Sequence, residues 1–150
     1  MTSRNVLILH HLEPMWESGY KKLGTSFARM CEKVIDHLND HRYRQIILTR
    51  FEDTKLDVQH YEVGLADIGM QIDVYEYGYG WDAAQIVDSP KDFVEGGYHS
   101  EAVMISDWMR DLPKAGIYLA GAFDGECIED MEIALRSLKV KFTRVEDLIV

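Results

Sequence analysis

Short apolar runs alternate with longer stretches of helical periodicity along this chain of 150 residues. The run Val-Leu-Ile-Leu at residues 6–9 contains no polar residue, which is typical of a strand buried on both faces. Four later segments also combine apolar residues with flanking turn signals, and they predict further strands. These segments cover residues 46–48, 71–77, 117–120 and 140–145.

Between these strands, apolar residues recur at intervals of three and four, which predicts helices with one buried face. Thr25 and Ser26 are the candidate caps of the first helix, Gly69 ends the second, and Pro113 ends the third, which begins at Ser100. Residues 78–99 show no regular pattern. The predicted helices cover residues 27–38, 56–69, 100–112 and 128–138.

The alternation of strands and helices favours an α/β fold: one three-layer, Rossmann-like domain over residues 1–150 with about five mostly parallel strands. Ligand sites in such sheets lie at the carboxyl ends of the strands, near the point where the strand order reverses. We therefore expect a site among the segments that follow the strands. These segments are residues 10–16, 50–54, 77–81 and 121–127.

Charge and composition narrow the possible partners. The net charge of −10 disfavours nucleic acid and anionic membranes, and the short basic segment 41–45 is interpreted as a solvated turn. Two cysteines form no disulfide framework, and neither a signal peptide nor a membrane span is evident, so we expect a cytoplasmic protein. Without a Gly-x-Gly-x-x-Gly motif or a metal-ligand spacing, we expect neither an organic cofactor nor a metal.

Cys127 is the candidate nucleophile, because it follows an apolar run that ends at Gly121 and stands where a helix begins. The positive end of a helix dipole and the unpaired amides of the first turn favour a thiolate. The amides of residues 125–127 would stabilise an oxyanion, and Gly125 would allow a ligand to approach the backbone.

The surrounding charges support a structural interpretation of the same turn. Four carboxylates close to Cys127 would raise the pKa of its thiol. In this interpretation Asp124 is the helix N-cap, and Cys127 packs against the sheet as a small apolar residue. The four carboxylates belong to Asp124, Glu126, Glu129 and Asp130.

The segment from about residue 99 to 150 resembles the isochorismatase-like cysteine hydrolases, which are amidases and related enzymes with a three-layer α/β fold. Gly121, Cys127 and Ile128 match the nucleophile turn of that family, and the apolar-Glu-Asp sequence at 145–147 matches its acidic ending. The resemblance implies a cysteine that attacks a carbonyl group, an aspartate after the first strand that takes the thiol proton, and a supporting lysine.

This chain departs from the family pattern at the aspartate, since His10 and His11 follow the first strand. A histidine is a competent base for a thiol, so His10 or His11 is the candidate general base. Lys91 lies near the place of the family's lysine, and Glu13 would orient an imidazole or act as a base itself. Alternatively, only the fold persists, and the histidines form a hydrogen-bonded pair at a strand end.

An aromatic cluster supports a second hypothesis. Tyr77, Tyr79 and Trp81 would stack on a ring-shaped ligand, or on a second copy of the chain in a homo-oligomer. The leading hypothesis is a small-molecule hydrolase that acts on an amide or related acyl group, with these rings, Gly125 and Glu13 binding the substrate. The alternative is a non-catalytic Rossmann-like protein that binds a nucleotide-like ligand or a protein partner.

A third hypothesis is a carboxylate-based enzyme acting on nucleosides, and no spacing distinguishes among its candidate residues. These candidates are Glu13, Asp53, Asp82 and Asp124.

Overall fold

The computed structural model describes residues 4–12, 16–50, 70–76 and 107–150, and every structural statement below refers to them. In chain order, these residues form five strands and four helices. They are β1 (Val6–His10), α1 (Glu17–Lys22), α2 (Phe27–Asp40), β2 (Gln45–Arg50), β3 (Gln71–Glu76), α5 (Asp107–Arg110), β4 (Ile117–Gly121), α6 (Cys127–Ser137) and β5 (Phe142–Ile149).

The five strands form one sheet in the order β3-β2-β1-β4-β5, and every neighbouring pair is parallel. The predicted α/β fold class is therefore confirmed. The chain first builds the sheet outward from β1 through β2 to β3, and then returns to add β4 and β5 on the other side of β1. The strand order thus reverses between β1 and β4, and the crevice at their carboxyl ends is where such sheets bind ligands.

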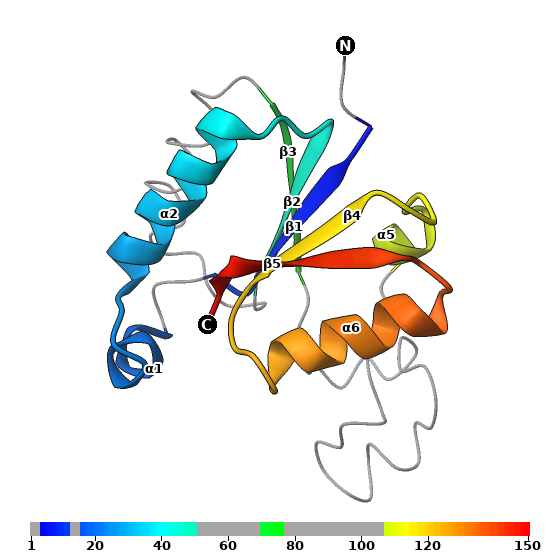
Figure 1. Ribbon diagram of the computed structural model, residues 1–150. Coiled ribbons are helices and arrows are strands. Elements are labelled where there is room, and N and C mark those ends of the chain that lie inside the picture. Colours follow the sequence, from blue (N-terminus) through cyan, green and yellow to red (C-terminus); the bar gives the residue numbers. More distant parts are fainter. Residues whose placement is uncertain (1–3, 13–15, 51–69, 77–106) are drawn as a thin grey trace, which may run out of the picture.

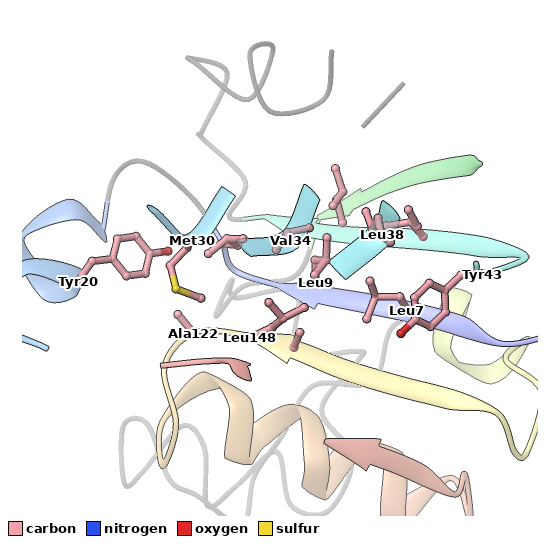
Figure 2. Packing of buried hydrophobic residues seen from close by; sticks show 13 residues of the cluster. Leu7, Leu9, Tyr20, Met30, Val34, Leu38, Tyr43, Ala122 and Leu148 are labelled. Carbon is pink, nitrogen blue, oxygen red and sulfur yellow. The ribbon is translucent and has the colours of Figure 1, made fainter. Parts of the chain in front are cut away.

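Helices cover both faces of the sheet, with α2 on one side and α6 on the other (Figure 1). Successive residues of β1 point to opposite faces: Val6 and Ile8 pack in the cluster around α6, whereas Leu7 and Leu9 pack in the cluster around α2. Figure 2 shows the second cluster, in which Leu7 and Leu9 lie opposite side chains of α2. The uninterrupted apolar run of β1 is explained by burial on both faces.

The predicted helix after Ser26 is α2, and side chains satisfy its first amides. Ser26 Oγ accepts a hydrogen bond from the amide of Arg29 (3.0 Å), and Glu17 Oε2 accepts one from the amide of Phe27 (2.7 Å). Glu17 begins α1, a helix of six residues that the periodicity did not predict because it is too short to show a repeating pattern. The short helix α1 thereby anchors the start of α2.

Two predicted segments differ from the structure. The last strand runs to Ile149 rather than ending at 145, because β5 bulges: Leu119 pairs with Arg144, whereas Gly121 pairs with Ile149. Residues 41–45 do not form a wholly solvated turn, since Tyr43 is buried beneath α2 and its ring contacts Tyr118 edge-on.

Other predicted segments lie outside the described residues, namely the helix over 56–69, the irregular segment 78–99 and the start of the helix at Ser100. The described part of that last helix is α5, which ends before Pro113. No helix in the described ranges is both long and apolar enough to cross a membrane.

Candidate functional site

The carboxyl ends of β1 and β4 meet at His10 and Gly121, which are partners in the parallel register. Gly121 has a φ of 126°, and a Cβ atom on it would overlap the main chain of His10. The next residue, Ala122, donates its amide hydrogen to the carbonyl oxygen of His10 (2.9 Å). This close contact holds the start of the loop between β4 and α6 against the end of β1, and it requires glycine at position 121.

Cys127 is the first residue of α6 and is half-buried. The amides of Glu126 and Ile128 both donate to the carbonyl oxygen of Phe123, at 3.0 and 3.2 Å. The Glu126 amide already has an acceptor in the protein. The prediction that the amides of residues 125–127 all donate to an oxyanion is therefore wrong for Glu126. The expected N-cap is also wrong: the N-cap is Glu126, without a side-chain cap bond, because Asp124 turns to an ion pair with Arg144.

His10 and His11 form a fully buried, stacked pair with ring centroids 4.0 Å apart. His11 adopts a φ of 53°, a left-handed conformation that histidine tolerates better than most residues. Its amide donates to Thr49, at 3.1 Å to the carbonyl oxygen and 3.2 Å to Oγ1, and the Tyr20 hydroxyl donates to its carbonyl oxygen (3.4 Å). Thr49 Oγ1 also lies 2.7 Å from Nδ1 of His10. The pair is thus held from β2 and from α1.

Burial lowers the pKa of His10 well below 6.5, and the neighbouring His11 lowers it further. Hydrogen bonding between the imidazole and the main chain of Cys127 raises the pKa of His10 and so acts in the opposite direction. The His10 ring is consequently neutral near pH 7. It also lies within hydrogen-bonding reach of the residue that begins α6.

An aromatic cluster fixes the loop that carries Cys127. The ring of Phe123 contacts Trp16 edge-on, with centroids 6.4 Å apart, and lies 5.3 Å from the ring of Tyr20. A Cβ atom on Gly19 would come within 2.6 Å of the Phe123 ring, so α1 packs directly on it. Trp16, the residue before α1, therefore has a structural role, because its ring packs against Phe123 of this loop.

Arg144 of β5 joins the same loop to α6. Its guanidinium lies 3.0 Å from Asp124 Oδ1 in the loop, 2.9 Å from Glu132 Oε1 in α6 and 2.8 Å from Glu146 Oε1. Glu132 is almost completely buried and has a second, longer contact with Arg136 (3.7 Å). The hydrogen bond to Glu146 is the main reason that the pKa of Arg144 is raised. Arg144 thus carries a permanent charge that ties three elements together.

Four of the predicted site residues lie in the described ranges: His10 and His11 at the end of β1, and Gly125 and Cys127 at the start of α6. The structure brings the His10 ring together with His11 and with the main chain of Cys127. The other predicted site residues lie outside the described ranges. They are Glu13, Tyr77, Tyr79, Trp81 and Lys91, together with Asp53 and Asp82 of the carboxylate hypothesis.

The acidic ending at 145–147 lies apart from the histidine pair. Glu146 binds Arg144, and the charge of Asp147 acts on His37 of α2. Cys31 is half-buried against the α2 cluster, where burial and the neighbouring Glu32 raise the pKa of its thiol to about 12, so it is a structural cysteine. Sequence reasoning missed Thr49 and Arg144, because only the strand register shows what each of them contacts.

Within the described part of the chain, no group of three or more histidine, cysteine, aspartate or glutamate residues could hold a metal ion. Comparisons with family models, with curated proteins and with solved structures found no match to this chain.

Proposed function

We propose that this protein is a hydrolase that cleaves an amide, ester or related acyl group of a small molecule through the thiol of Cys127. The observation that carries the proposal is the place of the buried His10 ring, which ends β1 on the sheet face that α6 covers, beside the main chain of the residue that begins α6. This place lies where β1 adjoins β4 and the strand order reverses. A base beside a cysteine at a helix start is the arrangement that nucleophilic catalysis requires.

In the proposed reaction the Cys127 thiol gives its proton to the neutral His10 imidazole as Sγ attacks the carbonyl carbon. The carbonyl oxygen becomes an oxyanion, which the amide of Gly125 stabilises. His10 then returns the proton to the leaving amine or alcohol, and a thioester remains on Cys127. Water attacks that thioester with His10 again taking a proton, so the acid is released and the thiol is restored.

Features around the two residues support this chemistry. Apart from Gly125 itself and its two chain neighbours, no heavy atom of the described chain lies within 4 Å of where a Cβ on Gly125 would stand, so a ligand can approach the backbone there. Stacking with His11 keeps the His10 ring in place. Lys91 remains part of the proposal as an electrostatic helper, and Glu13, Tyr77, Tyr79 and Trp81 remain as substrate-binding residues.

The experiment that tests the proposal measures the reactivity of each cysteine. Iodoacetamide should alkylate Cys127 at pH 7 faster than it alkylates an unstructured cysteine peptide, and His10→Gln should slow this reaction about tenfold. Cys31→Ala is the matched control and should leave the rate at Cys127 unchanged. With p-nitrophenyl acetate, we expect a burst of nitrophenolate stoichiometric with the protein, which Cys127→Ala abolishes. Ordinary reactivity at Cys127 together with no burst would refute the proposal.

The complete burial of His10 and His11 favours a second candidate function, because a buried pair is also a structural feature of a strand end. In this alternative the protein is a non-catalytic Rossmann-like domain that binds a nucleotide-like ligand or a protein partner through residues 77–81. Neither proposal involves binding to nucleic acid, and both assume a cytoplasmic setting. A homo-oligomer is a further arrangement to test under either proposal. Ordinary thiol reactivity combined with saturable nucleotide binding would support the alternative.

A further inference from the structure

Thr49 is a buried threonine near the end of β2, and it contacts both histidines. It is the register partner of His10, and the alternation along β2 places it on the same face as Ile47, which packs in the α6 cluster. Its Oγ1 lies 2.7 Å from Nδ1 of His10, 3.2 Å from the amide of His11 and 3.5 Å from the carbonyl oxygen of Leu9.

The contacts of this hydroxyl determine which edge of the His10 ring takes part in chemistry. A hydroxyl has one hydrogen to donate and two lone pairs, and the His11 amide occupies one lone pair. Thr49 can then donate to Nδ1, or it can accept from a protonated Nδ1 while its hydrogen turns to Leu9. In both states Nδ1 is engaged by Thr49, so Nε2 is the ring nitrogen left to face Cys127.

The two states of the hydroxyl correspond to the two neutral tautomers of the ring. When Thr49 donates to Nδ1, the hydrogen of the ring is on Nε2, and Nε2 cannot take the proton of a thiol. When Thr49 accepts from Nδ1 and donates to the carbonyl oxygen of Leu9, Nε2 carries no hydrogen and can act as the base. Thr49 then accepts from Nδ1 both before and after the proton transfer, so no side chain is required to move.

We propose that Thr49 is the positioning residue of this site, whose hydroxyl accepts from Nδ1 of His10 and thereby holds the ring with an Nε2 that carries no hydrogen toward Cys127. The inference rests on the proposed function, since it assigns Thr49 a role in proton transfer from the Cys127 thiol. Thr49 does not touch the substrate in this account. It acts through His10, as the group that orients the base does in other nucleophile–base pairs.

The test substitutes the hydroxyl while keeping the shape of the side chain. Thr49→Val should change the ¹⁵N chemical shifts of the His10 ring, which report its tautomer, and should slow the alkylation of Cys127 by iodoacetamide about tenfold at pH 7, the equivalent of one lost hydrogen bond. Thr49→Ser keeps the hydroxyl and should restore both readouts to within about twofold of the original protein. Thr143→Val makes the same change at an exposed position of β5 and should alter neither readout.

Thr49→Ala also lacks the hydroxyl and replaces the valine variant if that variant does not fold. The inference is overturned if the folded variant keeps the original ¹⁵N shifts of His10 and the original alkylation rate. It is also overturned if Thr49→Ser is as slow as Thr49→Val. Ordinary reactivity of Cys127 in the original protein, together with no burst of nitrophenolate, refutes the proposed function instead, and the ¹⁵N shifts still decide whether Thr49 orients the ring.

Discussion

Gly121 is the residue on which the geometry of the candidate site depends most directly. Its φ of 126° lies in a region that side chains rarely adopt, and its Cα faces the main chain of His10 without room for a Cβ. Gly125, four residues later, also has a positive φ, at 76°, but open space beside it. Gly121 is therefore required both by its backbone conformation and by the close approach of His10, whereas Gly125 is required by its backbone conformation alone.

We predict that Gly121→Ala destabilises the protein by roughly 3 kcal/mol, because it combines a disfavoured conformation with a steric clash. Gly125→Ala should cost only about 1 kcal/mol, since the left-handed conformation is its only penalty. Urea unfolding followed by circular dichroism measures both values. Equal losses of stability in the two variants would show that the contact between Gly121 and His10 does not hold the strand ends together.

Among the larger elements, the loop between β4 and α6 is held from two sides. Phe123 packs under α1, and Asp124 pairs with Arg144, which also binds Glu132 of α6. The amide of Asp124 additionally donates to the carbonyl oxygen of Val150 (2.6 Å). These contacts give the first turn of α6 a defined position relative to β1, as the proposed nucleophile at that turn would require.

We predict that Arg144→Met costs about 2 kcal/mol of stability, because it leaves the buried carboxylate of Glu132 with only its longer contact to Arg136. Arg29→Met is the control: Arg29 pairs with Glu32 on the exposed surface of α2, where ion pairs contribute less than about 0.5 kcal/mol. The two free energies of unfolding are compared at low salt. A loss at Arg144 no larger than the loss at Arg29 would contradict the role assigned to the buried pair.

For the molecule as a whole, the hydrophobic pattern predicted the fold class, because the period of apolar residues follows directly from burial. Strand ends also follow from that pattern, so His10, Gly121 and Cys127 were found as candidates. The role of Thr49 was not predictable, since it depends on the register between β1 and β2. Arg144 was missed for the same reason, because its carboxylate partners come from the loop after β4, from α6 and from β5 itself.

Burial of neutral histidine makes the stability of the whole fold depend on pH. Burial, followed by the neighbouring His11, lowers the pKa of His10 well below 6.5, so the unfolded chain binds a proton at a higher pH than the folded protein does. The contribution of His10 to the free energy of unfolding is at its maximum above pH 6.5, where the ring is neutral in both the folded and the unfolded chain. As pH falls further it decreases by about 1.4 kcal/mol per pH unit, until the folded-state pKa is reached. Urea unfolding between pH 7.5 and 5 measures this decline, and His10→Gln should reduce its slope. An identical slope in that variant would show that His10 is not buried in its neutral form.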